Sequence, residues 1–157
     1  MNRTVDNLLS AISLSESSSI HLIDVENLVG SGVVTREAVS DLCQRYVEDV
    51  YASHEDLYFV AAGPQNAEAV REGWKAGQTF YQFRKGKDGA DIALVDFFQS
   101  IENINSFKSV FVASGDHSLE PVAQSCMTKS VPVTVVTGVG KLSRALANFP
   151  HLNVSGL

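Results

Sequence analysis

The sequence predicts an α/β domain, built as a three-layer sandwich with helices on both faces of a mostly parallel sheet of five or six strands. Short apolar runs alternate along the chain with longer segments of helical periodicity, which is typical of β-α-β units and therefore of a parallel sheet. Most of these runs are apolar almost throughout, as expected of strands buried on both faces. At 157 residues and 45% hydrophobic side chains, the chain has the size and apolar content of one domain.

The elements follow in order from these two signals. The predicted strands are Ile20–Asp24, Leu57–Ala62, Thr79–Phe83, Ser109–Ala113, Pro132–Thr137 and a weaker Leu152–Val154. The predicted helices are Arg36–Tyr51, Ala67–Lys75, Ala90–Ile101, Leu119–Lys129 and Lys141–Asn148. Before the first strand, a short helix over residues 5–14 and a serine-rich run to residue 19 predict a leader and linker, which places the domain at residues 20–157.

Composition narrows the classes of function. With 12 basic and 18 acidic residues the net charge is −6, which does not favour a module that holds nucleic acid by charge alone. An enzyme whose carboxylates hold divalent cations remains compatible, because the metal supplies positive charge. Cys43 and Cys126 lack the spacing of a zinc site or a disulfide framework, and no P-loop or dinucleotide fingerprint is present. Without a membrane-spanning apolar run or a secretory signal, we expect a cytoplasmic protein.

Carboxylates follow three of the predicted strands. Asp24 ends the first strand, Asp91 comes after the third, and Asp116 follows the fourth. In open parallel sheets the ligand crevice lies at the carboxyl ends of the strands, so all three are expected at one edge. Each could instead be a helix cap or a turn residue. Because neighbouring carboxylates repel and hard cations prefer oxygen ligands, the shared edge favours a site for Mg²⁺ or Mn²⁺.

The same three places carry sequence motifs. Residues 23–28, Ile-Asp-Val-Glu-Asn-Leu, resemble the opening D-x-x-N signature of NYN domains, a branch of the PIN-like nuclease superfamily. Residues 87–96 resemble the second motif, K-G-x-D-x-x-L-x-x-D, with one extra residue before the glycine. Residues 114–121 resemble the third, S-G-D-x-D-F-x-P, and the ordered resemblance covers about residues 20 to 154.

The resemblance implies a PIN-like fold and metal-dependent cleavage of RNA. By position it makes Asp24, Asp91 and Asp116 the catalytic, metal-binding carboxylates and Asn27 a polar partner at the substrate. Ser114 belongs to the third motif and is expected at the substrate as well.

Two further positions qualify this assignment. Asp96 matches the second acidic position of the middle motif, which would make it a further metal ligand. On a helix, however, it lies about 140° from Asp91, so it could instead orient neighbouring residues or lie outside the site. Ser118 stands where the third motif has its second Asp; serine can hold a metal-bound water but brings no charge. Glu26 or Glu120 could compensate for the missing carboxylate, and the sequence does not choose between them.

The one basic cluster, Arg84, Lys85 and Lys87, lies just before Asp91. It either contacts the phosphates of the substrate, in which case Lys85 and Lys87 are substrate-binding residues, or it is a solvated loop.

The leading hypothesis is a metal-dependent endoribonuclease of NYN type that uses Mg²⁺ or Mn²⁺. Its main rival is a catalytically degenerate domain that binds RNA or a protein partner, which Ser118 and the negative charge favour. A third reading, a phospho-receiver or phosphatase centred on Asp24, lacks a matching second motif. A homodimer is expected from the general frequency of dimers among small domains.

Overall fold

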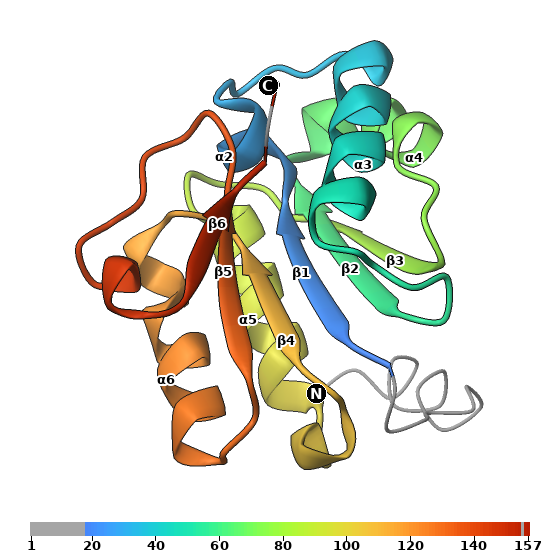
Figure 1. The fold of residues 1–157 in the computed structure, drawn as a ribbon. Coiled ribbons are helices and arrows are strands. Elements are labelled where there is room, and N and C mark those ends of the chain that lie inside the picture. The colour runs from blue at the N-terminus through green and yellow to red at the C-terminus, as the bar shows by residue number, and fades with distance from the viewer. Residues whose placement is uncertain (1–17, 155) are drawn as a thin grey trace.

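Six parallel strands form a single sheet in the computed structural model, which describes residues 18–154 and 156–157 (Figure 1). The order across the sheet is β3-β2-β1-β4-β5-β6, and every neighbouring pair is parallel. The strands are β1 (Ile20–Asp24), β2 (Leu57–Ala62), β3 (Gln78–Phe83), β4 (Val110–Ala113), β5 (Val133–Thr137) and β6 (His151–Asn153). This is the strand order of doubly wound α/β sheets, in which the order reverses between β1 and β4.

Helices cover both faces of the sheet, which confirms the predicted three-layer sandwich (Figure 1). The α-helices are α2 (Val25–Val29), α3 (Arg36–Asp49), α4 (Ala67–Gly73), α5 (Gly89–Ser100) and α6 (Glu120–Thr128). Short 3₁₀ turns lie at η1 (Pro64–Asn66), η2 (Ile104–Ser106), η3 (His117–Leu119) and η4 (Leu146–Asn148).

The core is divided into two parts by the sheet, because successive side chains of a strand point to opposite faces. Leu22 of β1 packs with α5 and α6, together with Phe97 and Val122. The next residue, Ile23, packs on the other face with α2, α3 and α4, together with Leu42. Both faces of β1 and β2 are buried, which explains why these strands are largely apolar, with His21 and Asp24 as the polar exceptions in β1.

Two stretches differ from the prediction. The helix predicted over Lys141–Asn148 is wrong, since only its last turn, η4, is helical. The preceding loop is held by tertiary hydrogen bonds: the Ser143 amide donates to the Gly115 carbonyl at 2.9 Å, and the Gly140 amide donates to the Asn27 carbonyl at 3.2 Å. Conversely, α2 was not predicted; it begins directly after its N-cap, Asp24, and ends before its C-cap, Gly30, which has a left-handed φ of 79°.

The packed domain begins before residue 20. The leader helix predicted over residues 5–14 lies outside the described residues, as does most of the serine-rich run. Its last two members, Ser18 and Ser19, are buried, so they belong to the domain rather than to a linker. The Ser19 amide donates to Asp56 at 3.0 Å, and its hydroxyl contacts that of Ser109 at 2.7 Å.

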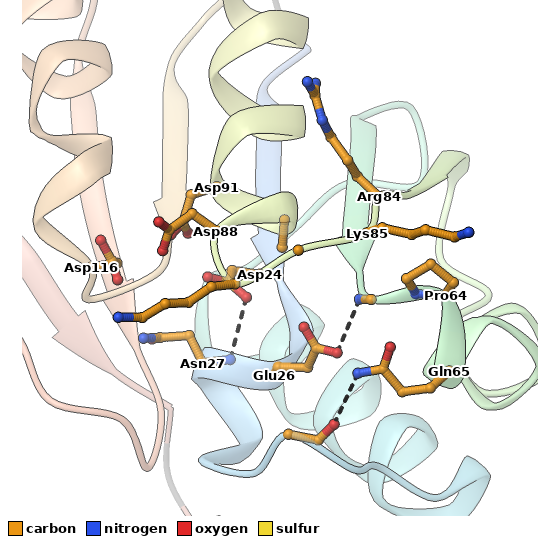
Figure 2. A pocket seen from close by; sticks show the side chains of 15 residues that line it. Asp24, Glu26, Asn27, Pro64, Gln65, Arg84, Lys85, Asp88, Asp91 and Asp116 are labelled. Atoms are coloured by element: carbon orange, nitrogen blue, oxygen red, sulfur yellow. Dashed lines mark hydrogen bonds between the residues drawn. The ribbon is translucent and has the colours of Figure 1, made fainter.

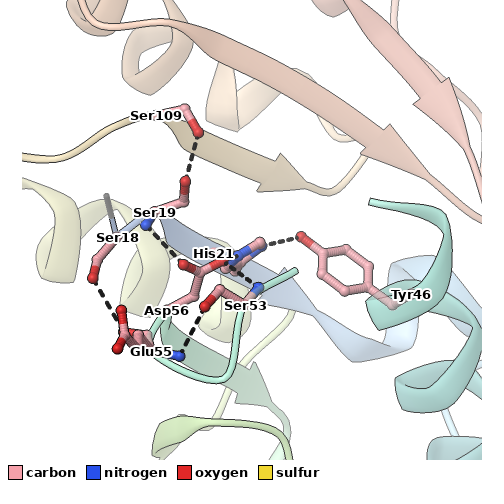
Figure 3. Close-up of polar contacts among 8 residues, drawn as sticks. All are labelled: Ser18, Ser19, His21, Tyr46, Ser53, Glu55, Asp56 and Ser109. Atoms are coloured by element: carbon pink, nitrogen blue, oxygen red, sulfur yellow. Dashed lines mark hydrogen bonds and ion pairs between the residues drawn. The ribbon is translucent and has the colours of Figure 1, made fainter. Parts of the chain in front are cut away.

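A buried polar network closes the amino-terminal edge of the sheet (Figure 3). The His21 ring lies between the hydroxyl of Tyr46 and the carboxylate of Asp56, 2.7 Å from each. It also stacks between the rings of Tyr58 and Phe111, with centroids 4.5 and 4.7 Å away. Burial lowers the pKa of His21, although Asp56 acts in the opposite direction. The network lies toward the amino ends of the strands, whereas the candidate site lies at their carboxyl ends.

Candidate functional site

A pocket of about 700 Å³ opens at the carboxyl ends of the strands (Figure 2). Its lining falls into three groups. One side is acidic, the loop after β3 is basic, and the remaining side is uncharged. The acidic side has Asp24, Asp88, Asp91 and Asp116; the basic loop has Arg84, Lys85 and Lys87; the uncharged side has Gly32, Gly63, Pro64 and Gln65; Glu26 and Asn27 lie between them. The three predicted carboxylates therefore meet in one pocket.

Asp24 is the most deeply buried of the three, with 5% of its surface exposed. One carboxylate oxygen accepts the Asn27 amide at 3.3 Å and so caps α2, while the other accepts the Ser114 hydroxyl at 3.1 Å. Burial, followed by the charge of the hydrogen-bonded Asp91, raises the pKa of Asp24 to about 8. Asp24 is thus both a helix cap and a member of the acidic cluster.

Asp91 reaches Asp24 from the first turn of α5. The tight turn before this helix depends on Gly89, since a Cβ atom there would lie 2.2 Å from the Arg84 carbonyl oxygen. Burial raises the pKa of Asp91, and the neighbouring charge of Asp116 adds to this effect. Asp88 precedes the helix and lines the pocket without capping it.

Asp116 lies beyond the end of β4 and is bonded to Ser118. Its Oδ1 accepts the Ser118 hydroxyl at 2.6 Å and the Ser118 amide at 2.9 Å. Burial raises the pKa of Asp116, but these hydrogen bonds outweigh it and lower the pKa below its usual value. Ser118, which stands where the resembled motif has a second Asp, is therefore a hydrogen-bond partner of Asp116.

Asn27 and Ser114 both donate hydrogen bonds to the carboxylate of Asp24. The Asn27 side-chain oxygen accepts the Gly115 amide at 2.9 Å, which ties the end of β1 to the loop after β4. Gly115 itself is crowded, because a Cβ atom there would lie 2.1 Å from the Lys141 carbonyl oxygen. Ser114 is fully buried and donates to Asp24, so its predicted contact with substrate is replaced by a supporting role. Asn27 still lines the pocket.

All three predicted basic residues line the pocket, but their side chains differ in what they contact. Lys85 and Lys87 are exposed and line the pocket. The Arg84 side chain leans away from Asp24 and Glu26 (Figure 2) and pairs with Asp96 at 3.0 Å on the outer side of α5. Asp96 is exposed and does not line the pocket, and its contact with Arg84 orients a neighbouring side chain.

The acidic side offers carboxylate oxygens, the ligand type that hard divalent cations prefer. Neither Asp24 nor Asp91 forms an ion pair with a described basic residue, and both have raised pKa values. In their present arrangement, no three His, Cys, Asp or Glu side chains among residues 18–154 and 156–157 form a metal-binding group. Mg²⁺ commonly uses one or two carboxylates and keeps several waters, so Asp24 and Asp91 would suffice as direct ligands.

The uncharged side of the pocket was missed by the sequence reasoning. Gly63, Pro64 and Gln65 follow β2, a strand end that carries no carboxylate and was therefore not singled out. Their place could have been predicted from the parallel sheet, because the loop after β2 lies at the same edge as the loops after β1 and β4.

Comparisons with known proteins found no matching family model, no matching curated protein and no matching solved structure. The resemblance to NYN domains thus rests on the three motifs quoted above. Among the described residues, none of the helices has the length and apolar character needed to cross a membrane.

Proposed function

We propose that this chain is a metal-dependent endoribonuclease of NYN type, which hydrolyses phosphodiester bonds in RNA with Mg²⁺ or Mn²⁺. The observation that supports it most is the contact between Asp24 and Asp91, two carboxyl groups buried together without a basic partner. Such a pair is costly unless protons or a cation neutralise it. Its place beside an exposed lysine loop, in an open pocket, suits a phosphate-bearing substrate.

Each residue has a distinct role in this proposal. Asp24 and Asp91 would hold the metal, and Asp116 would accept a hydrogen bond from a water of its shell. When bound, the metal supplies Lewis acidity and an activated water. Lys85 and Lys87, which line the same pocket, would contact the phosphate and offset its charge. Ser114 and Asn27 keep the carboxylates in place.

The test is cleavage of a pool of single-stranded and structured RNA with Mn²⁺, with Mg²⁺ and with EDTA. Asp24→Asn and Asp91→Asn should abolish cleavage. Asp96→Asn is the matched control, because it removes a carboxylate from the same helix outside the pocket. Folded wild-type protein that cuts no RNA in either metal, or an Asp91→Asn variant that still cuts, would reject the nuclease.

A second candidate is a domain that binds RNA or a protein partner without cleaving. It is favoured by Ser118, which occupies the place of an acidic residue, and by the absence of a three-ligand group among the described residues. RNA affinity that is equal in EDTA and in Mn²⁺, together with no cleavage, would select this candidate. A cytoplasmic location and a homodimer belong to the proposal as well, and the dimer is tested by light scattering in solution.

A further inference from the structure

The uncharged side of the pocket is a distinct surface, which we call the neutral wall: Gly32, Gly63, Pro64 and Gln65. It lies across from the acidic residues, with Lys85 above Pro64 (Figure 2). Its exposed side chains are the proline ring of Pro64 and the carboxamide of Gln65, while the backbone groups of Gly63 already hydrogen-bond within the protein. These groups suit a ribose or a nucleobase better than they suit a phosphate or a metal ion.

Glu26 also lines the pocket and is hydrogen-bonded to the neutral wall. Its Oε2 accepts the backbone amide of Gly63 at 3.0 Å and also the side-chain amide of Asn66. In Figure 2 its carboxylate is turned toward the neutral wall, whereas Asp24 is turned toward Asp91. The two acidic residues of the first motif therefore serve opposite sides of the same pocket.

Asn66 extends the connection to the loop after α2. With 2% of its surface exposed, it donates to the Gly32 carbonyl at 3.0 Å, and its oxygen accepts the Val34 amide at 3.1 Å. Two segments distant in sequence, residues 26–34 and residues 63–66, are thereby joined through one carboxylate and one carboxamide. Loss of the Glu26 acceptor would release Gly63 and leave the buried amide of Asn66 short of one partner.

We infer that the neutral wall holds the nucleoside next to the scissile phosphate, and that Glu26 is a positioning residue for this wall and not a metal ligand. The inference rests on the proposed function and names a subsite within it. The volume of about 700 Å³ lies within the usual range for ligand pockets and leaves room beside the acidic cluster. A nucleoside there would place its phosphate between the lysine loop and the acidic pair.

The two roles for Glu26 predict different responses to substitution. A positioning residue needs only an acceptor oxygen, which Glu26→Gln keeps, whereas a metal ligand needs the negative charge. We expect Glu26→Gln to resemble the wild type in KM, in kcat and in the Mn²⁺ concentration for half-maximal cleavage. Glu26→Ala should raise KM about tenfold, which corresponds to about 1.4 kcal/mol, with kcat and the Mn²⁺ requirement nearly unchanged.

Binding of RNA by the neutral wall is tested with substitutions of exposed residues, which should leave the fold intact. Gln65 is exposed, so Gln65→Ala should raise KM several-fold without altering thermal stability. Glu68→Ala is the matched control, since it removes an exposed carboxylate from the adjacent α4. RNA affinity, measured by fluorescence anisotropy with a labelled oligoribonucleotide in EDTA, should weaken in Gln65→Ala and Glu26→Ala and remain unchanged in Glu68→Ala.

The outcomes separate this inference from the proposed function. A wild type that does not cleave rejects the nuclease, while the anisotropy series still decides whether the neutral wall holds RNA. Loss of cleavage in Glu26→Gln with a raised Mn²⁺ requirement would make Glu26 a ligand and overturn its positioning role. RNA affinity and KM that are unaffected by Gln65→Ala would overturn the subsite.

Discussion

The carboxyl groups of Asp24 and Asp91 are hydrogen-bonded to each other at the carboxyl end of β1. Such a bond between two acids requires a proton on one of them, and burial with the neighbouring charge raises the pKa of Asp24 to about 8. Near neutral pH the pair therefore keeps a proton that a bound cation would displace. This exchange makes both stability and metal binding depend on pH.

Asp24→Asn should stabilise the metal-free protein at alkaline pH. In the wild type, the folded-state pKa of Asp24 is about 8 and exceeds the usual value of 3.8. At a pH between these two values, only the folded state holds the proton on Asp24. The stability it contributes is complete below about pH 4 and is lost as pH rises toward 8. The stability of the variant does not decline in this way. At pH 8 its free energy of unfolding should exceed that of the wild type by roughly 2–5 kcal/mol, apart from pH-independent effects of the substitution. Urea unfolding in EDTA, followed by fluorescence of the single buried Trp74, measures it.

The control for this measurement is Asp96→Asn, whose carboxylate forms only an exposed ion pair. It should change the stability by less than about 1 kcal/mol at any pH. A parallel decline of the wild type and Asp24→Asn between pH 5 and pH 8 would contradict the protonated pair.

Metal should stabilise the folded protein. A cation that binds only the folded state at about 100 times its Kd adds about 2.7 kcal/mol, which for a domain of this size raises Tm by roughly 5–10 °C. Since metal displaces the proton of the acid pair, the rise should be larger at pH 8 than at pH 6. Differential scanning fluorimetry with Mn²⁺, Mg²⁺ and EDTA measures it, and both Asp24→Asn and Asp91→Asn should lose the rise. A rise retained by both variants would place the ion elsewhere.

Ser118→Asp should strengthen metal binding. A second carboxylate beside Asp116 increases the negative charge of the site, which tunes cation affinity, so half-saturating Mn²⁺ should fall about tenfold. Without metal, the added repulsion and the loss of the 2.6 Å hydroxyl bond should cost roughly 1–2 kcal/mol of stability. Ser118→Asn is the matched control of similar size without charge. Mn²⁺ titration by calorimetry decides the point, and equal affinities for the two variants would refute the role of charge.

The network around His21 should make the fold sensitive to mild acid. Burial lowers the pKa of His21 from 6.5, so below that value the unfolded state binds a proton that the folded state excludes. Stability is therefore complete above about pH 6.5 and falls as pH drops toward the folded-state pKa. His21→Phe should remove this dependence and cost about 2–4 kcal/mol at pH 7, because Asp56 and Tyr46 lose their shared partner. Urea unfolding between pH 5 and pH 7.5 measures both effects.

His54→Gln is the control for this series, since His54 is exposed. Its unfolding curve should keep the pH dependence of the wild type. If His21→Phe kept the same dependence on pH, another group would have to titrate in this range.

Much of the fold was readable from local patterns. The largely apolar runs predicted β1 and β2 with their observed bounds, because strands buried on both faces are built mostly from apolar side chains. The start of α3 was marked by Thr35, whose hydroxyl does accept the Ala38 amide at 3.1 Å. Asp24, Asp91 and Asp116 could be placed at one edge because parallel strands bring their carboxyl ends together.

Other features could not be read from local patterns. Ser114 lies inside a motif, yet whether it faces substrate or supports Asp24 depends on how β4 lies against β1. The same holds for the segment predicted as a helix over Lys141–Asn148, whose composition permits a helix but whose Ser143 amide donates to the Gly115 carbonyl of another loop.

By itself the sequence determined the layers, the parallel sheet and the edge at which the acidic residues gather. Only the tertiary structure decided which acid serves which side of the pocket, and that His21 is held by Asp56. Glu26 and Asn66 are 40 positions apart, and His21 and Asp56 are 35 apart. The physical reason is that apolar periodicity is a local property of the chain, whereas a hydrogen bond between distant polar side chains forms only once packing has brought its partners together.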